Sequence, residues 1–223
     1  MTRTTMRRRV SYRRAVAVAA CVAVAGFAAS AGVASAAPAP AKITVTFGSC
    51  SGGGSEFCFN PESAFTAVGG QAMWTNQSGV GHTATSCTSS ACPGAPASTG
   101  TNTFNVTLSG SGTGSFTFSG GGIYYYYCTI HGYAAMHGKI TVFNPPRISG
   151  FTPKSGAPGT TVTITGTHLD HLIKVTFNGS KGSVVTDSQT KITVKVPTGA
   201  TTGRIAVVTR GGTSTTSTNF TVT

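Results

Sequence analysis

The most informative stretch of this sequence is YYYYCTIHGYAAMHG, residues 124–138. It places one cysteine, two histidines and one methionine between Cys128 and His137, in a chain otherwise rich in Gly, Ser and Thr. The aromatic run before the cysteine is typical of a β-strand, whose side chains alternate between two faces. Tyr124 and Tyr126 are therefore predicted to share a face with Cys128, and the other two tyrosines to point the opposite way.

The spacing of these residues predicts a metal site. Cys128, His131 and Met136 offer a thiolate, an imidazole and a thioether from a strand end and the loop behind it. Such donors suit copper, and two histidines, one cysteine and a weak axial methionine form the blue-copper arrangement. The second histidine must come from another strand, because one tight loop cannot surround an ion. His82 qualifies, since AMWTNQSGVGHTATS, residues 72–86, reads as a strand, a Gly-rich turn and then the histidine.

Each of these residues has a simpler interpretation when it is taken alone. A lone buried cysteine is most often an inert small hydrophobic residue, and a methionine in a barrel usually fills the core. The fixed spacing together with a distant fourth donor favours copper. His137 directly follows Met136 and is expected to point elsewhere, toward the surface. His168 and His171, in GTHLDHLIK, are interpreted as part of a solvated loop rather than a surface metal site.

The neighbours of the predicted ligands suggest how the site meets its surroundings. Small and aromatic residues follow His131, from Gly132 to Ala135, so its ring edge is expected near an apolar surface that suits brief docking. Asn76 or the backbone of Thr83 is expected to restrain the metal loop, the segment from Cys128 to Met136 that carries three of the predicted ligands.

The cysteine count agrees with one thiol being reserved for a metal. The chain has six cysteines, of which Cys21 lies in the N-terminal segment, and the remaining five cannot all pair with one another. Four of them allow three pairings. Short loops favour Cys50–Cys58 and Cys87–Cys92, which leaves Cys128 free.

The first 36 residues are predicted to be a signal peptide. Six arginines precede an acid-free apolar run from Ala15 to Ala29, and Ala34-Ser35-Ala36 follows as a small-residue cleavage site. The run is shorter than the roughly 20 residues of a membrane-spanning helix, and no later segment is long enough. We therefore expect a secreted or extracytoplasmic protein, exported by the general or the twin-arginine route, with a transmembrane segment absent from the mature chain.

Charge and composition divide the mature chain into two domains. Removal of the signal peptide lowers the formal charge from +12 to +6, and the surplus lies entirely after Asn144. Pro145-Pro146 cannot continue a strand ladder and is typical of an extended connection. We predict domains at residues 37–144 and 145–223.

Both domains are predicted to be all-β. Apolar residues alternate in short runs separated by Gly, Ser, Asn and Pro turns, and no mature segment sustains a helical period. Two β-sandwiches or barrels are the expected architecture. The runs are Ile43/Val45/Phe47, Phe104/Val106/Leu108, Phe116/Phe118 and Ile140/Val142, then Val162/Ile164, Val175/Phe177, Ile192/Val194/Val196 and Ile205/Val207.

The segments MWTNQSGVGHTATS and GIYYYYCTIHGYAAMHGKITV resemble the plastocyanin and pseudoazurin branch of the cupredoxins, the small blue-copper proteins. The resemblance covers roughly residues 42–143. It implies a Greek-key β-barrel in which His82, Cys128, His131 and Met136 hold one type 1 copper ion. Two features depart from the family: the acidic docking patches of some plastocyanins are absent, and the Cys-rich insert SCTSSACPGAPAS is unusual.

The second domain resembles an IPT/TIG domain, an immunoglobulin-like β-sandwich, from Pro146 to Val222. The matching pieces include P-x-I-x-G-F-x-P, V-x-F-N-G and V-P-x-G-A-x-x-G, and the domain has no cysteine and no catalytic constellation. We interpret it as a spacer or docking element. Its basic surplus suits an anionic cell-wall polymer, an acidic redox partner or a membrane surface, although a scattered solvated surface explains the charge equally well. Export argues against a nucleic-acid partner.

These features predict a one-electron carrier that cycles between Cu(I) and Cu(II) and serves a redox partner protein. It is not expected to be an enzyme: a multicopper oxidase needs His-x-His pairs, which are absent, and a histidine-brace monooxygenase needs an N-terminal histidine, whereas the mature chain would begin with Ala. The alternative function is an envelope-associated copper-holding or cell-surface binding protein without electron transfer.

Overall fold

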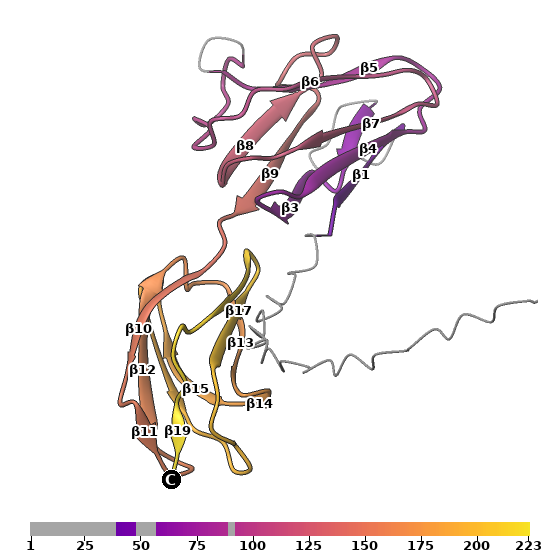
Figure 1. The fold of residues 1–223 in the computed structure, drawn as a ribbon. Coiled ribbons are helices and arrows are strands. Elements are labelled where there is room, and N and C mark those ends of the chain that lie inside the picture. The colour runs from indigo at the N-terminus through magenta and orange to yellow at the C-terminus, as the bar shows by residue number, and fades with distance from the viewer. Residues whose placement is uncertain (1–38, 48–56, 89–91) are drawn as a thin grey trace, which may run out of the picture. The chain divides into compact units, whose positions relative to one another are not determined.

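The computed structural model describes residues 39–47, 57–88 and 92–223 (Figure 1). The predicted signal peptide, residues 1–36, and Cys50 lie outside these ranges. Every described element is a β-strand or a loop, as the sequence predicts, and the described residues contain no helix. In the same residues, no helix is long and apolar enough to cross a membrane.

Nine strands in two sheets form the first domain, and both sheets contribute to one core. In the first sheet the order is β2-β1-β4-β7, and in the second it is β3-β9-β8-β5-β6. The pairs β1–β4 and β3–β9 are parallel, and the other pairs are antiparallel. The strands are β1 (Ala41–Phe47), β2 (Phe57–Asn60), β3 (Ser63–Ala67), β4 (Gln71–Asn76), β5 (His82–Ser86), β6 (Asn105–Leu108), β7 (Thr113–Thr117), β8 (Gly122–Tyr127) and β9 (His137–Phe143).

Aromatic side chains fill the space between these two sheets. Trp74 of β4 is fully buried, with its ring 5.5 Å from that of Tyr126 on β8. Tyr124 and Tyr126 are buried on the face that leads to Cys128, whereas Tyr125 and Tyr127 are half-buried on the other face. The predicted alternation of buried and half-buried tyrosines along β8 is therefore confirmed. Cys128 directly follows this strand, which is anchored in the core.

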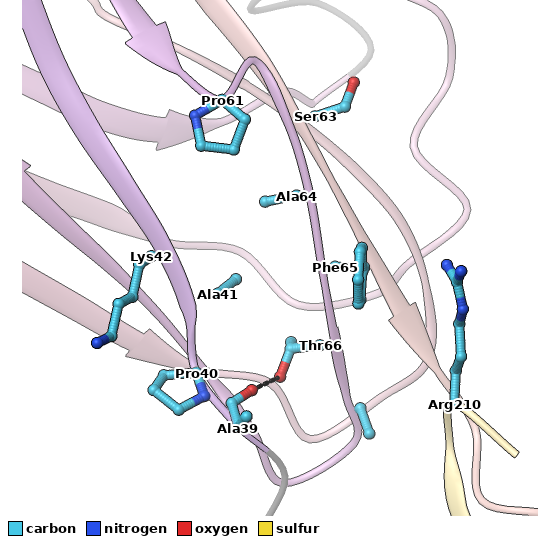
Figure 2. Close-up of a pocket in the computed structure, with 11 residues that line it drawn as sticks. Ala39, Pro40, Ala41, Lys42, Pro61, Ser63, Ala64, Phe65, Thr66 and Arg210 are labelled. Carbon is cyan, nitrogen blue, oxygen red and sulfur yellow. Dashed lines mark hydrogen bonds between the residues drawn. The ribbon is translucent and has the colours of Figure 1, made fainter. Parts of the chain in front are cut away.

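The chain enters β1 alongside β3. The buried Thr66 of β3 donates a hydrogen bond to the carbonyl of Ala39, at 3.1 Å, just before β1 begins (Figure 2). Lys42, Pro61 and Ala64 are among the residues that line a pocket beside this contact. The hydrogen bond links the segment just before β1 to β3, the edge strand of the second sheet.

The second domain is a sandwich of the kind that the sequence predicts. Its larger sheets have the orders β10-β12-β16-β15 and β14-β13-β17-β18, and β11 pairs with β19 in parallel. Apolar residues such as Val162, Ile164 and Val207 are fully buried in its core. The strands are β10 (Arg147–Thr152), β11 (Ser155–Gly156), β12 (Thr161–Thr167), β13 (Leu172–Phe177), β14 (Ser180–Lys181), β15 (Ser183–Asp187), β16 (Lys191–Lys195), β17 (Ile205–Thr209), β18 (Gly212–Thr215) and β19 (Thr221–Val222).

Each sheet and each of the two core clusters consists of residues that lie either before Asn144 or after Pro145 in the sequence. The domain limits 37–144 and 145–223 remain predictions.

Candidate metal centre

Three of the four predicted ligands meet at one end of the first domain. His82 begins β5, Cys128 directly follows β8, and His131 lies in the loop that leads to β9. Their ligand atoms all lie within 4.8 Å of one another. The sulfur of Cys128 is 3.3 Å from Nδ1 of His131 and 3.8 Å from Nδ1 of His82. Two distant segments thus supply a sulfur and two nitrogens to one place.

This centre is largely shielded from solvent. Cys128 and His82 are 0% and 1% exposed, and His131 is half-buried. The fold therefore removes water from the sulfur and from one imidazole, while the other imidazole stays near the surface. The predicted position of the His131 ring, close to the surface, agrees with this burial.

Met136 lies next to the same centre through its backbone. The amide of Cys128 donates to the carbonyl of Met136 at 3.0 Å, and the amide of Met136 donates to the carbonyl of Gly132 at 3.0 Å. Its side chain is 1% exposed and belongs to the same core cluster as Cys128. These bonds fold the loop back over the cysteine. The role of Met136 as an axial ligand remains a prediction.

Strand pairing explains why His82 and Cys128 come together. β5 and β8 are antiparallel neighbours, with Ser86 opposite Tyr126. Near the end of this pair the amide of Thr83 donates to the sulfur of Cys128 at 3.4 Å. The amide of Thr129 donates to the hydroxyl of Thr83 at 2.9 Å. The backbone of Thr83 therefore restrains the metal loop, which is one of the two restraints that the sequence suggests.

Phe57 is a residue of this centre that the sequence did not reveal. Its half-buried ring lies 4.8 Å from the ring of His82 and 5.2 Å from that of His131. Phe57 belongs to β2, in the sheet opposite the one that carries β5 and β8. No local spacing relates it to the ligands, because only the packing of the two sheets brings it there.

Burial and a neighbouring imidazole act together on His82. Desolvation, and secondly the charge of His131, lower the pKa of His82 below its usual value of 6.5. The neutral imidazole, which has a lone pair to donate to a metal, is therefore the favoured form at neutral pH.

The other histidines lie outside the cluster. His137 donates from Nδ1 to the carbonyl of Tyr133 at 2.7 Å, and its Nε2 is 3.2 Å from Glu62. His171 is largely exposed and lies 3.4 Å from Asp170. In the part of the chain that the structure describes, His82, Cys128 and His131 form the one group of three or more His, Cys, Asp or Glu residues placed to hold a metal.

The cysteines divide as the short loops suggest. Cys87 and Cys92 form a disulfide, which confirms one predicted pair. Cys58 is also disulfide-bonded, and its predicted partner Cys50 lies outside the described residues. Within the described ranges Cys128 is the free cysteine, so its sulfur is available to a metal.

Comparison with protein families agrees with this geometry. Residues 46–143 match the family of copper binding proteins named for plastocyanin and azurin. The first domain is a cupredoxin. Residues 146–223 match the IPT/TIG domain, so a cupredoxin domain precedes an IPT/TIG domain in this chain. Cupredoxins bind copper, and His82, Cys128 and His131 are placed to take part in such binding.

Solved structures similar to the chain include two cupredoxins. A purple cupredoxin from Nitrosopumilus maritimus is 25% identical, with a TM-score of 0.35, and the match covers 46% of this chain and 98% of that one. A Sinorhizobium pseudoazurin is 20% identical, with a TM-score of 0.34, over 47% and 73% of the two chains.

A third solved structure, an auxiliary nutrient binding protein from Bacteroides thetaiotaomicron, is 26% identical, with a TM-score of 0.33, over 36% of this chain. The chain spans 18 to 21% of the length of this and two other Bacteroides proteins. No curated protein matched.

Proposed function

We propose that this chain is an exported one-electron carrier that holds one type 1 copper ion through His82, Cys128, His131 and Met136. The observation that supports it best is the meeting of the Cys128 sulfur with two imidazole nitrogens, all within 4.8 Å. A copper ion, when bound, supplies a centre that accepts and returns a single electron. The donor set fits copper, because thiolate sulfur favours Cu(I) and imidazole suits Cu(II).

The protein's own contribution is a set of donors that is held in place and largely shielded from water. The amide of Thr83 orients the sulfur of Cys128, and backbone hydrogen bonds hold the loop from Cys128 to Met136. Phe57 packs against both imidazole rings from the opposite sheet. Because these groups are held before any electron moves, little has to rearrange during transfer.

Electrons enter and leave near His131. Its half-buried ring lies next to an exposed loop that includes Ile130, which is 63% exposed, and Ala134 and Ala135. An apolar surface of this kind suits brief contact with a redox partner protein. We propose this surface as the docking site of that partner.

The IPT/TIG domain serves as a basic spacer or docking module. Eight lysines and arginines stand against two acids after Asn144. We propose an anionic cell-wall polymer as the partner for this charge, and binding to it would hold the carrier at the cell envelope. The basic residues are Arg147, Lys154, Lys174, Lys181, Lys191, Lys195, Arg204 and Arg210.

Addition of Cu(II) to the purified mature protein tests the ligand set. The wild type is expected to turn intensely blue through charge transfer from the Cys128 thiolate, and Cys128→Ser and His82→Ala to stay colourless. His137→Gln is the matched control, because His137 lies beside Met136 in sequence but outside the cluster, so this variant should stay blue. A colourless wild type, or the same colour in all variants, would contradict the copper site.

Kinetic measurements distinguish an electron carrier, which is not an enzyme, from a copper-holding protein. Mixing with inorganic one-electron oxidants and reductants in a stopped-flow instrument should bleach and restore the blue band rapidly and repeatedly. A protein that stores copper would instead lose the ion to a chelator readily and respond slowly to the oxidant. That second result would sink the carrier function and leave the copper site intact.

A further inference from the structure

The two ring nitrogens of His82 face different parts of the protein. Nδ1 faces the sulfur of Cys128 at 3.8 Å, and Nε2 lies 2.9 Å from the hydroxyl oxygen of Ser78. A neutral imidazole carries its proton on one nitrogen and a lone pair on the other. The position of that proton therefore decides which nitrogen can bind a metal, and the hydrogen bonds around Ser78 determine it.

Hydrogen bonds to the backbone fix the orientation of the Asn76 amide. Its Nδ2 lies 2.6 Å from the carbonyl of Val80 and 2.7 Å from that of Ser109, and carbonyl oxygens only accept hydrogen bonds. The atom at this position must therefore be the nitrogen of the Asn76 amide and not its oxygen. The backbone amide of Ser78 donates to Oδ1 of Asn76 at 3.0 Å, which agrees with this orientation. Asn76 is 1% exposed, so its amide is held in place by protein groups.

The orientation of the Asn76 amide in turn decides where the single proton of the Ser78 hydroxyl points. Oδ1 of Asn76 lies 2.7 Å from this hydroxyl, and the carbonyl of Val80 lies 3.3 Å from it. Both groups only accept, so the proton goes to the nearer one, Asn76. If Nε2 of His82 were also an acceptor, the proton would have to leave Asn76, and two oxygen lone pairs would face each other at 2.7 Å.

We infer that Asn76 and Ser78 are positioning residues that fix His82 with its proton on Nε2 and its Nδ1 lone pair turned toward Cys128. His82 donates from Nε2 to Ser78, and Ser78 donates to Asn76. The network also prevents rotation of the buried ring. The consequence for copper rests on the proposed function, whereas the position of the proton is a property of the metal-free protein.

Long-range 1H–15N NMR of the metal-free protein tests the proton position directly. The wild type should show the Nε2–H form of His82, and Ser78→Ala should show a mixture of both forms or a mobile ring. Ser78→Thr keeps the hydroxyl and should restore the wild-type spectrum. An Nδ1–H form in the wild type would overturn the inference even if Ser78→Ala does not fold.

Copper binding gives a second readout with a matched control. Ser78→Ala should lower copper affinity about 10- to 100-fold, as loss of a hydrogen bond to a ligand typically does, and Ser78→Thr should recover it. Ser86→Ala is the control, because Ser86 is buried on the same strand as His82 but its hydroxyl hydrogen-bonds to the backbone of Phe104. It should leave the His82 spectrum and the affinity unchanged.

The two readouts separate this inference from the proposed function. Equal affinity and an unchanged His82 spectrum in Ser78→Ala would overturn the role of Ser78 while a blue wild type kept the copper site. A colourless wild type would remove the proposed function, and the metal-free spectrum would still decide where the proton of His82 resides.

Discussion

His82 is a buried base whose charged form is unfavourable in the folded protein. Its side chain is 1% exposed, and burial together with the charge of His131 lowers its pKa. In the unfolded chain the same imidazole regains its ordinary value of 6.5. Protonation of His82 therefore opposes folding as well as metal binding.

The stability of the metal-free protein is expected to fall as the pH drops below about 6.5, because the unfolded chain then binds a proton that folded His82 resists. The contribution has a slope of up to about 1.4 kcal/mol per pH unit. Urea unfolding at a series of pH values measures it. His82→Asn, which cannot titrate, should remove this part of the slope, and an identical slope in the variant would refute the assignment.

The side chains of the centre differ in how far the sequence predicted them. Cys128 and His131 share one short loop, so their spacing indicated a common site, and His82 followed from the need for a second strand. Phe57 and Ser78 were not predicted as members of the centre. Their contacts depend on the packing of two sheets and on a hydrogen-bond network around a turn, which no short spacing records.

The loop between β8 and β9 turns through Gly132. This residue has a φ of +78°, a left-handed conformation that side chains other than glycine rarely adopt. Its amide donates to the carbonyl of Cys128 at 2.9 Å, and its carbonyl accepts from the amide of Met136. The turn at Gly132 therefore holds the backbone that carries three predicted ligands, Cys128, His131 and Met136.

Gly132→Ala should destabilise the metal-free protein by about 1–2 kcal/mol, because a left-handed residue with a side chain is strained. Gly132→Asn should cost less, since asparagine tolerates this conformation better. Denaturant unfolding provides the measurement. Gly81→Ala is the control, because a methyl group there would meet only the carbonyl of Leu108, at 4.0 Å. Equal stability of the two alanine variants would show that the turn bears no strain.

The strands were predicted well where the pattern is local, and their partners were not. The alternation of tyrosines in β8 followed from the two-residue period of a strand, and the structure confirms it. The parallel pairs β1–β4 and β3–β9 join segments that are distant in sequence. Alternation records which face of a strand is buried but not which strand lies beside it.

The described residues form two hydrophobic cores that share no residue. One core consists of residues from Ala41 to Val142, and the other of residues from Phe151 to Phe220. Every sheet also stays within one of these two groups. Each group thus has the apolar core that an independent folding unit needs.

Residues 37–144 produced alone should fold and bind Cu(II) with the same absorption spectrum as the mature chain. Residues 145–223 should retain any binding to an anionic polymer such as a teichoic acid, and this binding should weaken as salt increases. Absorption spectra and sedimentation with the polymer are the two measurements. A changed spectrum in the shorter protein would mean that the second domain contributes to the copper site.

The complete burial of Cys128 also bears on how such a protein survives among oxidants. Thiol exchange requires one sulfur to approach another, and a side chain that is 0% exposed beneath its loop cannot make that approach. In the oxidising compartment that the proposed export would place it in, the folded domain thus protects its unpaired sulfur from wrong disulfides and from cross-linking to a second molecule. It does so without any external reductant, because the fold itself denies access.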